Sequence, residues 1–126
     1  MKRYLLSQTT TFLLTLLLGV TAHAAGDPLR GAEVFRQTCS ECHSQEPGQN
    51  LVGPTLFSVV GRPAGTITGY SYSSAMKSSG IVWTPDELMV YLKAPRKHVP
   101  GIKMRFAGLS DKQDRENVVA YLATLR

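Results

Sequence analysis

The sequence contains little of what stabilises disulfide-rich domains or spans membranes. Its 126 residues include two cysteines and one tryptophan, which excludes a framework of several disulfides. No apolar stretch reaches the ~20 residues that a bilayer core requires. Strand-like alternation is scarce, and there is no internal repeat or low-complexity tract in the part that follows residue 24. These absences leave a single small domain that is mainly helical.

Acidic residues are missing between Glu87 and Asp111, where basic residues gather. The basic patch consists of Lys93, Arg96, Lys97, Lys103 and Arg105. The net charge of +5 is too mild to demand nucleic acid. Clustered charge of one sign steers partners of opposite charge, although an ordinary solvated face also carries such charges. We therefore expect an acidic protein partner and no nucleic acid.

The first 24 residues have the three parts of a secretory signal peptide. A basic tip, Met1–Arg3, precedes a short apolar run over residues 12–20, and Ala22-His23-Ala24 presents small residues to a signal peptidase. The run is too short for the alternative, a retained membrane anchor. We predict cleavage after Ala24 or the neighbouring Ala25, a mature domain of residues 25–126 without stable membrane insertion, and a periplasmic location. Without Lys2 and Arg3, 12 basic residues face 9 acidic ones, a net charge of +3.

Helix-capping residues divide the mature chain into helices joined by loops. Asp27-Pro28 predicts the start of the first helix, since Asp caps free N–H groups and Pro suits the first turn. Thr84-Pro85 predicts a second helix, with Glu87 completing a capping box, and Pro95 ends it. A second box formed by Ser110 and Gln113 predicts the last helix.

A long connection, Ser44 to Trp83, separates the first two helices. It contains six glycines and three prolines. A loop of that length in a compact domain needs something that organises it, and small domains often depend on a bound metal or cofactor. A large flat ligand wrapped by the loop would meet both needs.

The segment Cys39-Ser40-Glu41-Cys42-His43 is the C-x-x-C-H motif of covalent haem attachment. Two thiols at this spacing can form thioethers to the vinyl groups on one porphyrin edge, and the adjacent histidine can bind the iron. A thioredoxin-like redox pair would need a βαβ context that is absent. A zinc site would need four ligands, and His98 is badly spaced to complete one. We predict one covalently bound haem c.

The second axial ligand decides the function, because an open position admits O₂, peroxide or substrate, whereas a filled one makes an electron carrier. The candidates in the mature chain are Met76, Met89, Met104 and His98. Met104 lies in an irregular loop between charged neighbours, where simple core packing is not expected. Its soft thioether suits low-spin iron and raises the reduction potential. Met104 is therefore the predicted ligand.

Several further motifs occur in the order found in class I cytochromes c, and the chain most resembles the mitochondrial-type and bacterial c2-like members. The matching segments are Cys39–His43, Gly53–Leu56, Gly61-Arg62, Gly69–Tyr72, Gly80–Trp83 and Pro100–Phe106. The resemblance covers roughly residues 27–125. It implies an all-α fold in which four to five helices wrap around one haem.

The resemblance also implies roles for residues around the iron. His43 and Met104 resemble the two axial ligands. Pro54 resembles the residue whose carbonyl accepts a hydrogen bond from the His43 ring, which fixes the tautomer of that ring. Tyr91 resembles the tyrosine whose hydroxyl approaches the methionine sulfur.

Other implied contacts lie at the propionates and between the terminal helices. Arg62, Tyr72 and Trp83 resemble the polar groups that bind the haem propionates, whose buried charge needs donors. Gly31 resembles the glycine that lets the first helix approach Tyr121 on the last helix. For the aromatic residues, plain core packing is the alternative.

The function implied by this resemblance is electron transport rather than catalysis. A monomeric carrier would exchange single electrons with acidic-faced proteins of a respiratory or photosynthetic chain, such as a membrane oxidase, a bc1-type complex, a reaction centre or a periplasmic dehydrogenase. Two alternatives stay open. One is a haem enzyme or sensor with a labile sixth ligand, such as a small peroxidase; the other is a dedicated electron-accepting subunit of a periplasmic dehydrogenase.

Overall fold

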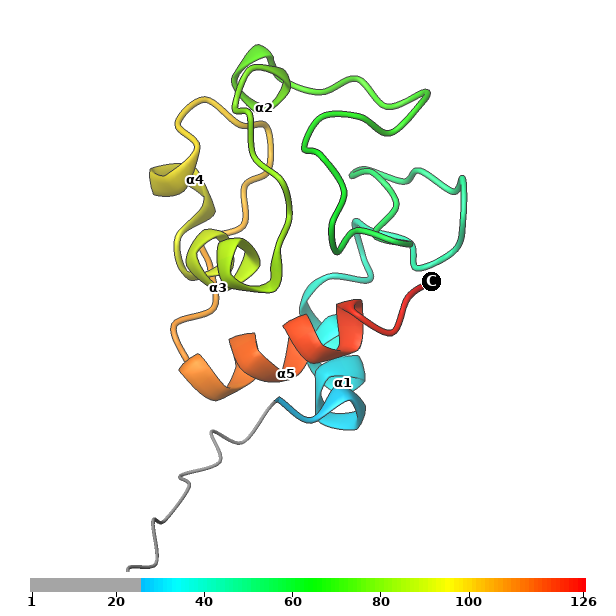
Figure 1. Ribbon diagram of the computed structural model, residues 1–126, viewed down its shortest axis with the longest axis vertical. Coiled ribbons are helices and arrows are strands. Elements are labelled where there is room, and N and C mark those ends of the chain that lie inside the picture. Colours follow the sequence, from blue (N-terminus) through cyan, green and yellow to red (C-terminus); the bar gives the residue numbers. More distant parts are fainter. Residues whose placement is uncertain (1–25) are drawn as a thin grey trace, which may run out of the picture.

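The computed structural model describes residues 26–126, and the predicted signal peptide lies outside them. Its helices are α1 (Pro28–Thr38), α2 (Ser74–Lys77), α3 (Pro85–Lys93), α4 (Pro95–His98) and α5 (Lys112–Leu122) (Figure 1). In this part of the chain, β-pairing is limited to an isolated bridge between Pro63 and Val82. The all-α prediction is confirmed.

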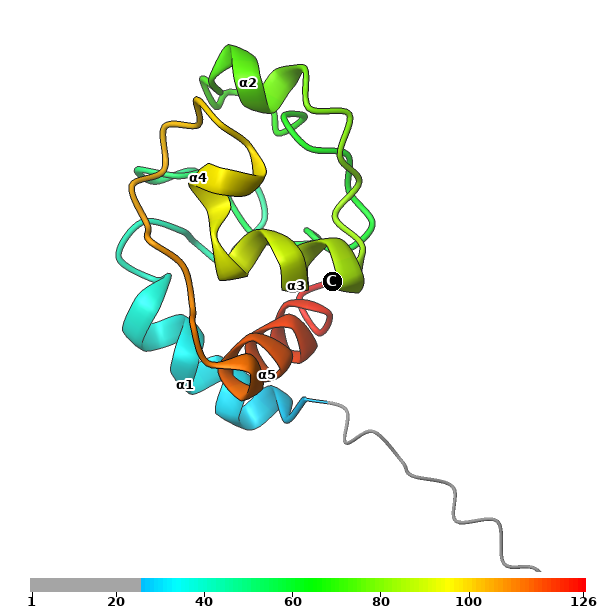
Figure 2. The same cartoon turned by 90° about the vertical axis from the view of Figure 1, so that its left-hand side faces the viewer.

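The helices form a frame that is closed by loops. Figure 2 shows α1 and α5 together at one end of the molecule, α2 at the other end, and α3 with α4 between them. None of the helices over residues 26–126 has the length and hydrophobicity that crossing a bilayer requires.

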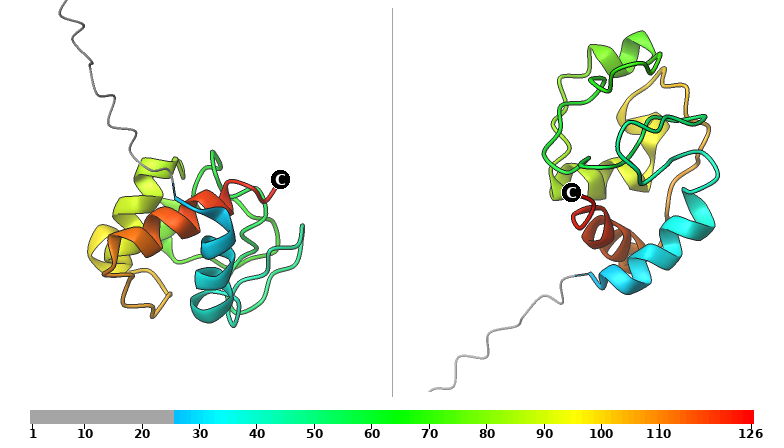
Figure 3. Two further views of the ribbon diagram at one scale, coloured as in Figure 1. Left: turned by 90° about the horizontal axis from the view of Figure 1, so that it is seen from below. Right: turned by 90° about the vertical axis from the view of Figure 1, so that its right-hand side faces the viewer.

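The frame rests on the crossing of α1 and α5 (Figure 3). Gly31 is buried there, and a Cβ atom on it would lie 1.9 Å from the backbone oxygen of Asn117. Four residues further along α1, the rings of Phe35 and Tyr121 lie with their centroids 5.4 Å apart. Only glycine permits so close an approach of the two backbones. The predicted contact of Gly31 with the last helix is confirmed.

The start of α1 is also held by α5. Asp27 caps α1 as predicted, because its side chain accepts a hydrogen bond from the Leu29 N–H at 2.9 Å. The N–H of Asp27 in turn donates to the Asn117 side chain at 2.8 Å. The cap and the helix crossing therefore reinforce each other, and they fix the direction in which α1 leads to Cys39.

The predicted capping box of α3 is only half correct. Thr84 accepts a hydrogen bond from the Glu87 N–H at 3.1 Å, as expected. The Glu87 carboxylate does not return to the Thr84 N–H, which donates to the Val82 carbonyl at 2.7 Å. The Glu87 carboxylate instead accepts a hydrogen bond from the ring of His98 at the end of α4. A tertiary contact has replaced the local one.

The predicted capping box of the last helix is wrong by one residue. Asp111, and not Ser110, is the N-cap of α5, and its carboxylate accepts from the Asp114 N–H at 2.8 Å. A carboxylate interacts more favourably than a hydroxyl with the positive end of the helix dipole. Gln113 consequently lies within the helix, where its amide donates to Asn117 at 3.1 Å.

Two short helices were not predicted from the sequence. Ser73 caps α2 through the Met76 N–H at 3.1 Å, and α2 divides the long connection before Trp83. Pro95 ends α3, as predicted, but it also begins α4. Four-residue helices show no apolar periodicity, so the pattern of the sequence does not reveal them.

Candidate haem-binding site

A cavity of about 670 Å³ lies between the helical frame and the loops. Its volume falls within the range of cofactor sites. The wall is formed by the end of α1, the long connection, α3, the loop over residues 100–106, and α5. All nine predicted cofactor contacts line it: Cys39, Cys42, His43, Pro54, Arg62, Tyr72, Trp83, Tyr91 and Met104.

The C-x-x-C-H motif forms a turn directly after α1. The N–H of Cys39 still bonds back into the helix, to Phe35, and the N–H groups of Cys42 and His43 both donate to the Cys39 carbonyl, at 3.1 and 2.9 Å. This turn directs both thiols and the imidazole to one cavity. The cysteines are not paired in a disulfide, and burial, together with Cys42, raises the pKa of the Cys39 thiol to about 11.

The imidazole of His43 is oriented by the backbone of the long connection. Its Nδ1–H donates to the Pro54 carbonyl at 2.7 Å, because a carbonyl can only accept. Nε2 is therefore the nitrogen with a free lone pair, which a metal ligand needs. Burial also lowers the pKa of His43, more than the Pro54 hydrogen bond raises it. This arrangement favours the neutral ring that binds iron.

Gly53 is a site residue whose role the sequence did not reveal. A Cβ atom on it would lie 2.3 Å from Cε1 of His43, so the backbone passes directly against the imidazole ring. The N–H of Gly53 also donates to the Cys42 carbonyl at 2.8 Å, which ties the long connection to the C-x-x-C-H turn. The one indication in the sequence that this position is constrained was that a glycine directly precedes Pro54.

The predicted propionate contacts gather along another part of the wall. Arg62 donates to the carbonyls of Phe57 and Thr55, both at 2.9 Å, which holds its guanidinium in place. Burial lowers the pKa of Arg62, although a guanidinium stays charged at neutral pH. The hydroxyl of Tyr72 accepts from the Ile67 N–H at 3.3 Å. The guanidinium of Arg62 and the hydroxyl of Tyr72 are thus polar groups in a largely apolar cavity, where they could bind carboxylates.

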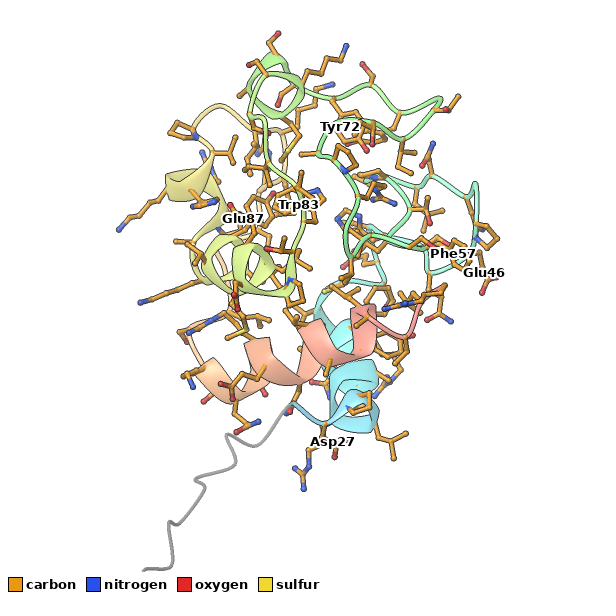
Figure 4. The ribbon with its side chains drawn as sticks, viewed as in Figure 1. Asp27, Glu46, Phe57, Tyr72, Trp83 and Glu87 are labelled. Carbon is orange, nitrogen blue, oxygen red and sulfur yellow. The ribbon has the colours of Figure 1, made fainter. Side chains whose placement is uncertain are left out.

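Trp83 and Tyr91 form an aromatic pair in the same wall. Trp83 lies in the interior beside α3 (Figure 4), and its backbone N–H donates to the Arg62 carbonyl at 3.0 Å. Its ring lies 4.6 Å from that of Tyr91, centroid to centroid. Burial raises the pKa of Tyr91, so its hydroxyl stays protonated and can donate a hydrogen bond.

The cavity narrows the choice of second axial ligand. Met104 and Met76 both line it, whereas Met89 and His98 do not. The segment that follows α1 and the loop over residues 100–106 lie on opposite sides of the view in Figure 1. Met76 belongs to α2, at the end of the frame. Both Met76 and Met104 therefore lie at the cavity, and the choice of Met104 as the axial ligand stays a prediction.

These residues fit a covalently bound porphyrin. The thiols are unpaired, one imidazole nitrogen is free, a guanidinium is fixed nearby, and the volume is large enough. Comparison with known proteins agrees. The cytochrome c family model matches residues 29–126. Cytochrome c2 of Rhodopila globiformis is 50% identical over 101 residues, which cover 80% of this chain and 95% of that protein.

Two further proteins, one of them with a solved structure, are similar to this chain. Cytochrome c of Euglena viridis is 46% identical over 101 residues, covering 80% of this chain and 99% of that one. The structure of cytochrome cH from Methylobacterium extorquens superposes with a TM-score of 0.74 at 44% identity, and covers 79% of this chain and 99% of its own. The agreement thus includes both sequence and fold.

The fold and the site define a class I c-type cytochrome with one haem. The chain belongs to the cytochrome c family. It carries one covalently bound haem c and is an electron carrier rather than an enzyme.

We predict that Gly53→Ala will impair haem incorporation. The added methyl group would overlap the imidazole of His43 and push it from its place. We expect the ratio of haem absorbance to protein to fall severalfold in material purified under identical conditions. The nearby exposed residue Leu51, which does not line the cavity, provides the control, since Leu51→Ala should leave the ratio unchanged. Equal haem content in G53A and the parent protein would contradict the role given to Gly53.

Proposed function

We propose that this chain is a periplasmic carrier that moves one electron at a time between redox proteins, through a haem held by His43 and Met104. One observation supports it above all: a single cavity is lined by the C-x-x-C-H turn and by a methionine from a loop near the other end of the sequence. Two protein ligands would leave no open position for a substrate.

Each residue would have a defined task. The haem iron supplies the chemistry, the gain and loss of one electron. Cys39 and Cys42 would anchor the ring, while the Pro54 carbonyl would keep His43 in the required tautomer. The Met104 thioether would favour the reduced state. The apolar enclosure acts in the same direction, because it disfavours the additional positive charge of the oxidised state. We therefore expect a positive reduction potential.

Export is supported by the sequence of the first 24 residues and by the chemistry of the site. A basic tip, an apolar run and an A-x-A sequence precede the mature domain. We propose that residues 1–24 direct export and are removed, and that Cys39 and Cys42 receive the haem afterwards.

The intact mass of the native protein tests this proposal directly. We expect the periplasmic fraction to contain a species that corresponds to residues 25–126, or 26–126, plus one haem that survives denaturation. The variant Cys39→Ala/Cys42→Ala should be exported but lose its haem in denaturant, because no thioether remains. A colourless native protein with the mass of its amino acids alone would disprove haem attachment, and a retained leader would disprove cleavage.

Substitution of the predicted axial methionine tests the carrier mechanism. We expect Met104→Ala to lose the long-wavelength absorption band of thioether-bound ferric iron, to bind carbon monoxide rapidly when reduced, and to lower the reduction potential by on the order of 0.1 V or more. Met89→Ala is the matched control, since Met89 does not line the cavity. An unchanged spectrum in M104A would rule out Met104 as the ligand. Rapid carbon monoxide binding by the parent would favour the enzyme or sensor alternative.

The partner surface that we propose is the basic patch beside the cavity. All five of its residues are exposed, and two of them, Lys103 and Arg105, also line the cavity. Positive charge therefore extends to the place where the cofactor would meet solvent. Such a surface suits an acidic-faced redox protein, for example a membrane oxidase, a bc1-type complex, a reaction centre or a periplasmic dehydrogenase.

Electron-transfer rates with small charged reagents test whether the basic patch steers its partners. We expect oxidation by anionic ferricyanide to slow severalfold as ionic strength rises from 0.01 M to 0.15 M, and to slow further in Lys97→Gln/Arg105→Gln at low salt. A cationic cobalt(III) complex should show the opposite trend. Arg30→Gln/Lys112→Gln removes the same charge from α1 and α5 and should have a smaller effect. Equal effects of both double variants would contradict local steering by the patch.

A further inference from the structure

Glu87 and His98 form a hydrogen-bonded pair that joins two helices. Glu87 lies in the first turn of α3, and His98 is the last residue of α4. The ring Nε2–H of His98 donates to the Glu87 carboxylate, and the two side chains are 27% and 31% exposed. Figure 4 places Glu87 beside α3, on the side of α4. A pair shielded to this degree is worth more than a fully exposed one.

The helix held by this pair has few other anchors. α4 contains four residues, and its N-cap, Ala94, makes no side-chain hydrogen bond to it. Pro95 and the following Val99 are buried, which attaches α4 through apolar contacts. The Glu87–His98 pair supplies a directional bond that apolar packing cannot provide.

The loop with Met104 begins where α4 ends. Val99 is followed by Pro100 and by Gly101, whose φ of 91° turns the chain toward Met104. Beyond that turn, the hydrogen bonds that hold the loop to other described segments are few. Lys103 donates to the Ser71 carbonyl at 2.5 Å, and the Leu109 N–H donates to the Leu92 carbonyl at 2.8 Å. Further along, the buried guanidinium of Arg115 on α5 donates to the Leu109 and Ser110 carbonyls at 2.6 and 2.8 Å. The position of α4 therefore sets where the loop starts.

The same pair also supports the cavity wall. The rings of His98 and Tyr91 are steeply inclined, at 73°, with 6.1 Å between their centroids, and Tyr91 lines the cavity with Met104. The Glu87 carboxylate binds His98 and does not accept from the Thr84 N–H, so the capping box at the start of α3 is incomplete. A local rule that is broken for a tertiary bond is typical of a position under functional constraint.

We infer that Glu87 and His98 are positioning residues that keep the Met104 loop closed against the cavity and so keep the sulfur on the iron. This inference rests on the proposed role of Met104 as axial ligand. The loop has a closed state and an open state, and the pair exists only in the closed one. Removing the pair raises the open population, and a competing ligand then binds the iron more tightly in proportion.

Imidazole binding to the oxidised holoprotein measures that open population, because imidazole must displace the sulfur. We expect Glu87→Ala and His98→Ala each to lower the apparent dissociation constant of imidazole about fivefold. The double variant should show no further decrease, since either substitution already breaks the pair. Glu87→Gln, whose amide oxygen can still accept from His98, should restore most of the parent value.

Glu116→Ala is the matched control. It breaks the Lys112–Glu116 pair on α5, whose carboxylate is 24% exposed, and neither residue lines the cavity. Whatever its effect on the melting temperature, it should leave imidazole affinity unchanged. If E87A and H98A lower the melting temperature without changing imidazole affinity, the pair is merely structural and the inference is overturned.

The spectrum of Met104→Ala separates this failure from failure of the proposed ligand. If M104A keeps the spectrum of the parent, Met104 is not the ligand and both proposals fall. If M104A loses the thioether band while E87A and H98A bind imidazole as the parent does, the ligand stands and only the role of the Glu87–His98 pair is disproved.

Discussion

The hydrogen bond from the His43 ring to the Pro54 carbonyl is the contact on which the arrangement of the site depends. It selects one imidazole nitrogen for the metal and joins the turn after α1 to the long connection. A second hydrogen bond, from the Gly53 N–H to the Cys42 carbonyl, joins the same two segments. The Gly53 backbone lies against the same ring, so closely that a Cβ atom there would overlap it. The remaining walls of the cavity are placed relative to this fixed group.

Rigid and loosely held parts of the molecule have separate tasks. The crossing of α1 and α5 is closely packed, and it delivers the two thiols at a fixed point. The Met104 side is built from a loop attached by a short helix, by hydrogen bonds from one lysine and one arginine, and by a few backbone bonds. If Met104 binds the iron as proposed, its bond would lie on this less constrained side and could be controlled there, while the proposed histidine ligand would stay fixed.

The residue pattern predicted several features that depend on neighbouring residues and missed several that depend on tertiary contacts, while the contact of Gly31 with the last helix was implied by the resemblance. Asp27 and Thr84 cap their helices as expected, because a capping side chain acts within its own turn. The resemblance to class I cytochromes c, together with the C-x-x-C-H motif, was enough to identify nine contacts that all line one cavity. The partner of Glu87 was not predictable, since His98 reaches it only after α4 folds back. Nor was Gly53, whose constraint comes from a ring ten residues earlier in the chain.

The junction of Asp27 with Asn117 spans 90 positions of the sequence. Bringing two residues this far apart in the sequence together costs more conformational entropy than forming a local turn. The contact also requires the C-terminal helix, which carries Asn117, to be present. The first helix therefore gains its main support only when nearly the whole polypeptide is available. A chain shortened by its final dozen residues would retain its entire haem-attachment motif and still lack the helix that holds that motif in place.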